Sequence, residues 1–268
     1  MYSREEAVQA SLVYFDGDTL AANVFIDKYA LKDNDGNILE KTPDEMHDRL
    51  AKEFARIEQK YPNPISYDEI RSYFDKFSKI VPQGSPMEGI GNNFRTTSLS
   101  NCYVIPSPVD SYGGILKADQ QQAQLMKRRG GVGMDISNIR PKGLATNNAA
   151  KTTDGIAVFM ERFSNTTREV AQGGRRGALM VCISVHSCEI DTFINIKRDK
   201  TKVTGANLSI KLSDSFMNAV KNDTDYIQQW PINSPNPVVT KTVRARDVWE
   251  QIIDAAWSSA EPGLLFWD

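Results

Sequence analysis

The sequence predicts an α/β protein in which a small helical region precedes a larger domain built on a parallel sheet or barrel. Two observations support this fold class. Residues 1–80 contain two well-capped amphipathic helices, and from residue 81 a helix, a glycine-rich loop and a buried strand follow one another repeatedly. A chain of 268 residues that is 40% hydrophobic and 25% charged suits one large domain or two small ones. We therefore place a helical region at 1–80 and an α/β domain at 81–268.

The helical region is predicted from two start signals. Thr42 precedes Pro43 and two acidic residues, an arrangement typical of a helix N-terminus, and apolar residues then recur at spacings of three and four. The segment 61–64, with two prolines, ends this helix. Ser66 and Glu69 have the spacing of a capping box and open a second helix, whose buried face carries Ile70, Tyr73, Phe74 and Phe77.

The α/β domain begins with a loop at 81–91 that is rich in glycine and proline. A strand is predicted at 98–105 and a helix at about 114–128. A glycine turn at 130–133 then enters a second strand, but it matches neither a Walker loop nor the full dinucleotide fingerprint. A second helix at 155–170, a glycine-rich loop at 172–177 and a strand at 178–185 repeat the pattern.

The remaining segments continue the alternation. We predict a short helix at 189–196, a strand at 203–210, a helix capped by Ser213, a linker at 234–237, a helix at 245–256 and an apolar strand within 261–268.

Composition and charge exclude several functions. The formal net charge of −2 gives no general attraction to nucleic acid or to an anionic membrane surface. No apolar run approaches the length of a membrane span, and the polar N-terminus is unlike a secretory signal. Three cysteines leave one unpaired in any disulfide scheme, which favours the reducing cytoplasm. With only His47 and His186, neither a Ser/His/Asp triad nor a histidine-based metal site is expected.

The cysteines and one arginine pair are the candidate reactive groups. A strand cysteine such as Cys102 or Cys182 is more often a small packing residue than a reactive thiol. Cys188 lies near His186, but no third group that would orient such a pair is visible. Arginines between glycines, as at 172–177, match phosphates because the fork binds two oxygens and glycine lets the backbone approach. A solvated surface pair is the alternative.

Several motifs, taken together, resemble one family. They agree in order and spacing with the catalytic subunit of ribonucleotide reductases, from about Val24 to the end of the chain. The motifs are Ser-Leu-Ser-Asn-Cys102, Arg-Gly-Gly-Val-Gly133, Ile-Arg-Pro-Lys-Gly143, Gln-Gly-Gly-Arg-Arg-Gly177 and Thr-Gly-Ala-Asn207. The amino-acid sequence around 173–180 most resembles the adenosylcobalamin-dependent class and its near relatives.

The resemblance implies an active site. Under it, the α/β domain is the first half of a ten-stranded α/β barrel, and Cys102 is one of two thiols that reduce the ribose and become a disulfide. The implied substrate-binding residues are Ser85, Asn101, Gly130, Gly131 and Arg176. A thioredoxin-type reductant would then restore the thiols.

The resemblance also implies regulation. Asp110, Ser111 and Arg140 would bind a deoxynucleotide (dNTP) effector, and the loops after Arg140 and at 172–177 would link that effector to the active site. Helices near 114–128 and 155–170 would form the contact of a homodimer. Two anionic ligands need backbone amides and arginines, which these loops supply.

One departure from the family pattern concerns the missing cysteines. The radical cysteine and the second reducing thiol belong to a later segment, and neither Cys182 nor Cys188 has that context. We therefore expect a fragment or a split-gene product, inactive alone, that needs the remaining C-terminal part of the catalytic subunit. The regulatory ATP-binding cone also has no counterpart in the pattern.

The sequence thus predicts part of a reductase that makes deoxyribonucleotides from ribonucleoside di- or triphosphates by radical chemistry. The radical would come from adenosylcobalamin or from a separate metal-containing subunit, and the sequence does not choose between them. A non-catalytic deoxynucleotide-binding regulatory chain is the alternative. A nicotinamide-dependent dehydrogenase is disfavoured because no complete Gly-x-Gly-x-x-Gly opens a helix.

Overall fold

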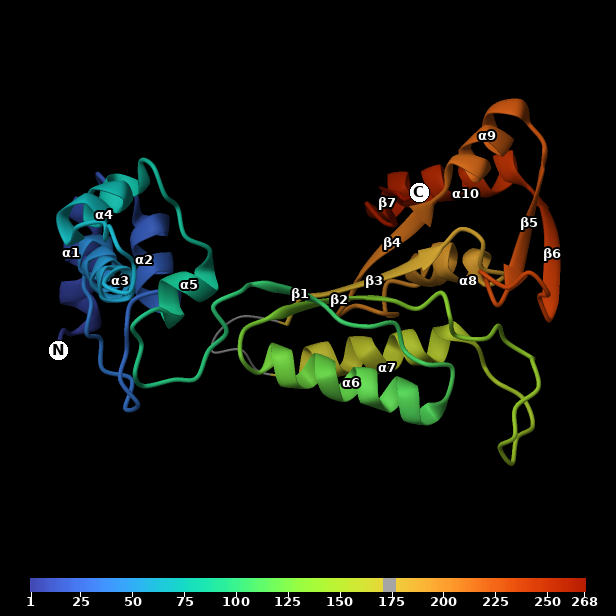
Figure 1. Ribbon diagram of the computed structural model, residues 1–268, viewed down its shortest axis with the longest axis horizontal. Coiled ribbons are helices and arrows are strands. Elements are labelled where there is room, and N and C mark those ends of the chain that lie inside the picture. The colour runs from blue at the N-terminus through green and yellow to red at the C-terminus, as the bar shows by residue number, and fades with distance from the viewer. Residues whose placement is uncertain (171–176) are drawn as a thin grey trace. The chain divides into compact units, whose positions relative to one another are not determined.

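The computed structural model describes residues 1–170 and 177–268, and these form two compact units (Figure 1). The first unit contains residues 1–101 and 128–130; the second contains 102–127, 131–170 and 177–268. Each unit is described by itself. Residues 81–101 pack with the first unit, whereas the domain boundary expected between residues 80 and 81 stays a prediction.

The first unit is helical, as predicted. Thr42 precedes the helix with Pro43 at its first position, and the Ser66 hydroxyl accepts a hydrogen bond from the Glu69 amide at 3.2 Å. Its helices are α1 (Arg4–Tyr14), α2 (Thr19–Lys28), α3 (Pro43–Glu58), α4 (Tyr67–Phe74), the 3-10 turn η1 (Asp75–Phe77) and α5 (Gly84–Gly89).

Helix α5 corrects the expectation of a loop throughout 81–91. Pro86 is the third residue of this short helix. Because the amides of the first helical turn have no partner inside the helix, proline loses no hydrogen bond there. The proline and glycine content that suggested a loop is therefore compatible with one and a half turns of helix.

The second unit contains a five-stranded parallel sheet whose strands lie side by side in chain order. The strands are β1 (Cys102–Val104), β2 (Gly131–Asp135), β3 (Leu179–Ser184), β4 (Asn207–Leu212) and β7 (Gly263–Phe266). The helices are α6 (Tyr112–Met126), α7 (Ile156–Glu169), α8 (Ile190–Asn195), the 3-10 turn η2 (Ile196–Arg198), α9 (Asp214–Asn222) and α10 (Ala245–Ser259). This arrangement confirms the α/β prediction and its parallel sheet.

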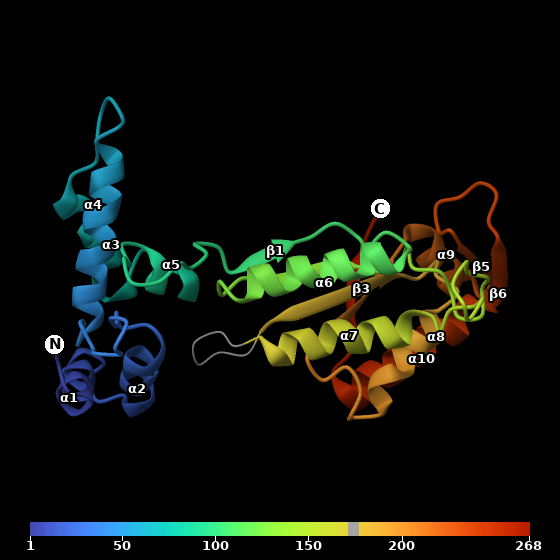
Figure 2. The same ribbon diagram turned by 90° about the horizontal axis from the view of Figure 1, so that it is seen from below.

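The faces of the sheet differ in burial. Met134, Val181 and Leu208 share one rung across β2, β3 and β4, and all three are at most 4% exposed. They belong to the core formed with α6 and α7, which run side by side along the sheet (Figures 1 and 2). The next rung, which includes Met180, faces the other way, and Met180 is 36% exposed. The helices therefore cover one face of the sheet.

Two strands begin later than predicted. The strand expected at 98–105 starts at Cys102, because the Ser98 hydroxyl bonds to the backbone of Ser100 and turns the chain before it. The strand expected at 203–210 starts at Asn207, because a turn bonds the Ala206 amide to the Val203 carbonyl oxygen at 3.3 Å.

A β-hairpin in the second unit was missed. Strands β5 (Asp225–Trp230) and β6 (Val239–Arg244) pair antiparallel, and the expected linker at 234–237 lies in their connection. The residues of β6 are mostly exposed and polar, so no apolar alternation marks the strand in the sequence. Among the described helices of both units, none has the length and apolar character needed to cross a membrane.

A buried histidine makes the first unit sensitive to acid. His47 is fully buried beside Phe74 and Phe77, with ring centroids 5.7 and 4.6 Å away, and neither ring nitrogen has a hydrogen-bond partner among the described residues. Burial, reinforced by the positive charge of Arg71, lowers the pKa of His47 from 6.5 to about 4. The imidazole is therefore neutral in the folded chain at neutral pH.

We expect the free energy of unfolding to fall as the pH drops from 6.5 to 4. In that window the unfolded chain binds a proton at His47 and the folded chain does not, which amounts to a loss of about 3 kcal/mol. Urea unfolding followed by circular dichroism at several pH values measures this loss. A His47→Leu variant should lose less stability between these pH values. Equal losses in both proteins would show that His47 does not cause the effect.

Candidate functional site

Three of the predicted substrate-binding residues belong to the first unit, and the structure links two of them directly. The backbone amide of Ser85 donates to Oδ1 of Asn101 at 3.0 Å. The Ser85 hydroxyl donates to the carbonyl oxygen of Arg129, the residue before Gly130, at 3.3 Å. Ser85 itself is fully buried. Ser85 and Asn101 thus fix the backbone that leads into Gly130.

A buried ion pair fixes the same backbone. Arg129 has a φ of +70°, a left-handed conformation that is uncommon outside glycine. Its guanidinium lies 3.2 Å from the carboxylate of Glu88, and both side chains are 6% exposed. Removing one partner of a buried pair would leave an uncompensated charge, so the pair constrains where both side chains can lie. Arg129 begins the motif Arg-Gly-Gly-Val-Gly133 that was noted in the sequence, whereas Glu88 was not predicted.

Cys102 and Gly131 lie in the second unit, on neighbouring strands. Cys102 is the first residue of the edge strand β1, its side chain is exposed, and Gly131 is its register partner on β2. Because Gly131 has no side chain, no β2 side chain stands beside the thiol on this rung. The predicted packing role for a strand cysteine therefore does not apply to Cys102. Arg176 lies outside the described residues, so its predicted contact with the substrate stays a prediction.

The three predicted effector-binding residues meet in one cavity of the second unit, with a volume of about 350 Å³. We call it the anion pocket. Its lining residues are Asp110, Ser111, Tyr112, Ile115, Arg140, Ala145, Thr146, Asn147, Asn148, Thr153 and Phe159. The structure brings the three residues together, and their role in binding an effector stays a prediction.

An ion pair joins the two loops of the anion pocket. Nε of Arg140 lies 2.6 Å from Oδ2 of Asp110, and the Arg140 amide donates to Oδ1 at 3.0 Å. One terminal nitrogen, Nη1, donates to the Ala145 carbonyl oxygen. Among the described residues, no acceptor bonds the other terminal nitrogen, Nη2. The guanidinium is therefore held in place with one donor group left for a ligand.

The start of α6 adds a second attraction for anions. Ser111 is the N-cap residue, and its hydroxyl accepts a hydrogen bond from the Gly114 amide at 3.0 Å. A side chain at position 114 would overlap the carbonyl oxygen of Val109, so glycine allows the loop and the helix to pack closely. The positive end of the helix dipole therefore faces the pocket that Arg140 lines.

Aromatic side chains form the apolar wall of the anion pocket. Tyr112 and Phe159 meet edge to face with ring centroids 6.0 Å apart. A pocket with a cation, a helix N-terminus and aromatic rings suits an anionic ligand that carries a flat ring, such as a nucleotide. Phe159 lies in the helix predicted at 155–170, and the loop after Arg140, which was predicted to link the effector to the active site, supplies the pocket residues from Ala145 to Thr153.

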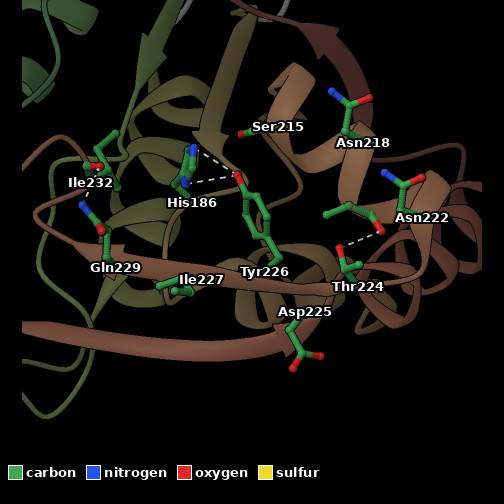
Figure 3. Close-up of a pocket in the computed structure, with 11 residues that line it drawn as sticks. His186, Ser215, Asn218, Asn222, Thr224, Asp225, Tyr226, Ile227, Gln229 and Ile232 are labelled. Carbon is green, nitrogen blue, oxygen red and sulfur yellow. Dashed lines mark hydrogen bonds between the residues drawn. The ribbon is translucent and has the colours of Figure 1, made fainter.

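A second cavity of about 620 Å³ lies at the β5–β6 hairpin (Figure 3). The Tyr226 hydroxyl is 3.1 and 3.0 Å from the two ring nitrogens of His186. Burial lowers the pKa of His186, which favours the neutral ring. The other lining residues are mainly neutral side chains of α9 and β5. No motif in the sequence marked this cavity.

The other two cysteines are less accessible. Cys182 on β3 is 8% exposed and lies near the ion pair between Asp135 and Lys211, 2.8 Å long. Burial raises the pKa of the Cys182 thiol to about 11, and burial also raises the pKa of Cys188. The described ranges 1–170 and 177–268 contain no group of three histidine, cysteine or acidic side chains that could hold a metal ion.

An α/β chain with an accessible strand thiol and a pocket that suits an anionic ligand with a flat ring is compatible with a nucleotide-dependent oxidoreductase. Comparison with known families specifies the class. A model described as the all-alpha domain of ribonucleotide reductase matches residues 15–83, and one described as its barrel domain matches residues 100–268. Because the barrel match covers more than half of the chain, this chain belongs to the ribonucleotide reductase family, a family of oxidoreductases. The predicted resemblance is confirmed.

Individual relatives agree. A vitamin B12-dependent ribonucleoside-diphosphate reductase of Thermoplasma acidophilum is 33% identical over 204 residues, covering 75% of this chain and 25% of the relative. Large subunits of ribonucleoside-diphosphate reductase from Caenorhabditis elegans and Arabidopsis thaliana are 25% and 26% identical, each over 63% of this chain. The chain spans about a quarter of the length of these curated relatives.

The three cysteines should differ in reactivity. We expect iodoacetamide at pH 8 to modify Cys102 first, because its side chain is exposed, and Cys182 last, because burial and a raised pKa keep its thiol protonated. Mass spectrometry of peptides from the folded chain, sampled over time, measures the three rates. Denaturation in urea should make the rates similar. Modification of Cys182 as fast as Cys102 in the folded chain would contradict this order.

Proposed function

We propose that this chain is part of a ribonucleotide reductase catalytic subunit that makes deoxyribonucleotides by radical chemistry. The observation that carries the proposal is the exposed Cys102 thiol at the start of β1, in the segment matched by the barrel domain of the family. An accessible thiol whose neighbour on the next strand is a glycine suits a residue that is oxidised and reduced in every turnover.

The proposed reduction uses two thiols. Cys102 and a second cysteine, in the remaining C-terminal part of the catalytic subunit, supply two electrons and two protons to the ribose. The 2′ carbon–oxygen bond breaks, its oxygen leaves as water, and the two thiols become a disulfide. A thioredoxin-type dithiol then reduces that disulfide by thiol exchange.

The proposed substrate is a ribonucleoside diphosphate or triphosphate. The names of the three relatives, all diphosphate reductases, favour the diphosphate. Ser85 and Asn101, with the backbone at Gly130 and Gly131, would position it, and Arg176 would contact it. The buried Glu88–Arg129 pair supports this proposal because it fixes the chain immediately before Gly130.

The proposed radical source is adenosylcobalamin, with a separate metal-containing subunit as the alternative. The B12-dependent relative, at 33% identity, favours the cobalamin, which supplies a radical when bound. The described residues do not fit as ligands of its cobalt, because His47 is fully buried and both ring nitrogens of His186 face Tyr226.

The proposed regulator is a deoxynucleoside triphosphate in the anion pocket. Nη2 of Arg140 and the start of α6 would bind its phosphates, and the Asp110 carboxylate would accept a hydrogen bond from its sugar. The groove along α6 and α7, with the Asp119–Arg162 pair at 2.9 Å, is the proposed contact of a homodimer.

The redox role has a direct test in the enzyme assembled from this chain and the remainder of the catalytic subunit. We expect Cys102→Ser to abolish multiple turnover with a dithiol reductant, because a serine hydroxyl cannot form the disulfide. Deoxyribonucleotide formation per active site measures this, and Cys188→Ser, in a loop of the second unit, is the matched control. Undiminished turnover by Cys102→Ser would disprove the role of Cys102.

Effector binding has a separate test by calorimetry on the chain with dATP, dTTP and dGTP. Arg140→Met should weaken binding of the preferred nucleotide at least about tenfold, because a hydrogen bond to a charged group contributes roughly 1.5–3 kcal/mol. Arg198→Met, which removes a surface pair with Asp254, should bind like the parent chain. Equal affinity for the parent and Arg140→Met would exclude Arg140 as a phosphate ligand.

The two tests together also address the alternative function. Nucleotide binding with no reduction in the assembled enzyme would favour a non-catalytic regulatory chain, whereas restored reduction favours the catalytic subunit.

A further inference from the structure

The β5–β6 hairpin reaches the anion pocket through one residue. Trp230, the last residue of β5, lies beside the loop that follows β2, and Figures 1 and 2 both show the hairpin next to that loop. The indole Nε1 of Trp230 donates to the carbonyl oxygen of Asn138 at 3.1 Å. Asn138 is two residues before Arg140, so the hydrogen bond holds the segment that carries the arginine.

The Trp230 ring also contacts the arginine itself. Cζ of Arg140 lies 5.5 Å from the centre of the indole ring, within the range of a cation–π contact. Trp230 is half-buried, and the Arg140 side chain is 27% exposed. A partly desolvated arginine that stacks on an indole loses rotamer freedom before any ligand arrives.

Each of these contacts occupies a different part of the Arg140 guanidinium. Asp110 bonds its Nε edge, the Ala145 carbonyl oxygen bonds Nη1, and Trp230 covers its ring-facing side. Nη2 is left without a hydrogen-bond partner among the described residues. The orientation of Arg140 is therefore fixed so that one donor group remains for a ligand of the anion pocket.

Trp230 is itself held from the opposite side. The backbone amide of the preceding residue, Gln229, donates to the carbonyl oxygen of His186 at 2.7 Å. The Gln229 side chain bonds the carbonyl oxygens of Ile232 and Ser234 at 3.1 and 2.9 Å, which ties it to the hairpin connection. Figure 3 shows Gln229 and His186 at the second cavity. The end of β5 is thus anchored to the turn that follows β3, which restricts the position of Trp230.

We propose that Trp230 is a positioning residue for the anion pocket, where it holds Arg140 and presents Nη2 to the phosphate of a bound nucleotide. This inference rests on the proposed effector function. It assigns part of the effector site to a hairpin that carries none of the predicted effector residues. Trp230 need not touch the nucleotide, because its contribution is the preorganisation of Arg140.

The first measurement is the affinity of the chain for the preferred deoxynucleoside triphosphate, by calorimetry. Trp230→Ala removes both the hydrogen bond and the stacked ring, and we expect binding about tenfold weaker. Trp230→Phe keeps an aromatic face but lacks the donor, and we expect a loss of about threefold. Trp257→Phe is the matched control, because Trp257 on α10 is 86% exposed and should leave the affinity unchanged.

The second measurement is tryptophan fluorescence during the same titration. The chain has four tryptophans, and only Trp230 is expected to report on Arg140. We expect the nucleotide to change the emission of the parent chain and of Trp257→Phe but not of Trp230→Phe. Loss of the change in Trp230→Phe shows that Trp230 is the reporter near the ligand, and the affinity of the same variant measures its effect on Arg140. Circular dichroism identifies variants that fail to fold, and Trp230→Phe then decides if Trp230→Ala is unfolded.

The outcomes distinguish the proposed effector function from the proposed role of Trp230. If the parent chain binds none of the three deoxynucleotides, the proposed effector function is wrong and the role of Trp230 is overturned with it. If the parent binds and folded Trp230 variants bind equally well, only the role of Trp230 is overturned. Weaker binding together with loss of the signal supports it.

Discussion

The ion pair between Asp110 and Arg140 is the contact on which the second unit depends for its anion pocket. Asp110 follows β1 and Arg140 follows β2, and these strands are parallel neighbours. The carboxyl ends of parallel neighbours lie at one edge of the sheet, so the two loops meet there. The ion pair joins the two loops. The start of α6 lies at the same pocket, and the Trp230 indole packs on Arg140. The chemistry of the pocket thus follows from strand order.

The proposed redox site lies at the opposite, amino end of the same strands. Cys102 opens β1 and is exposed, whereas Cys182 lies further along β3 and is 8% exposed. Both are strand cysteines, yet burial raises the pKa of Cys182 to about 11. Position along the strand therefore separates a candidate redox thiol from a packing thiol. In the first unit, the Glu88–Arg129 pair has a comparable positioning role for the backbone before Gly130.

The prediction of the fold from sequence succeeded where local signals are strong. Ser66 and Ser213, both predicted to open helices, accept hydrogen bonds at helix starts, and the apolar spacing of 155–170 matches the buried face of α7. It failed where tertiary contacts stabilise a polar segment, as in β6, or where proline suits a first helical turn, as in α5. Among the candidate site residues, Asp110, Ser111 and Arg140 were predicted, whereas Tyr112 and Trp230 carry no local motif.

The sequence by itself determined the family, the α/β class, the alternation of helices with the strands of a parallel sheet, and the residue types of the anion pocket. Those properties follow from the local spacing of apolar residues and from short motifs, which do not depend on distant contacts. Only the tertiary structure decided which of these residues meet, that Cys102 is exposed while Cys182 is covered, and that Trp230 packs on Arg140, ninety positions earlier in the chain. Contacts across that separation depend on how strands and helices pack, and no local pattern records them.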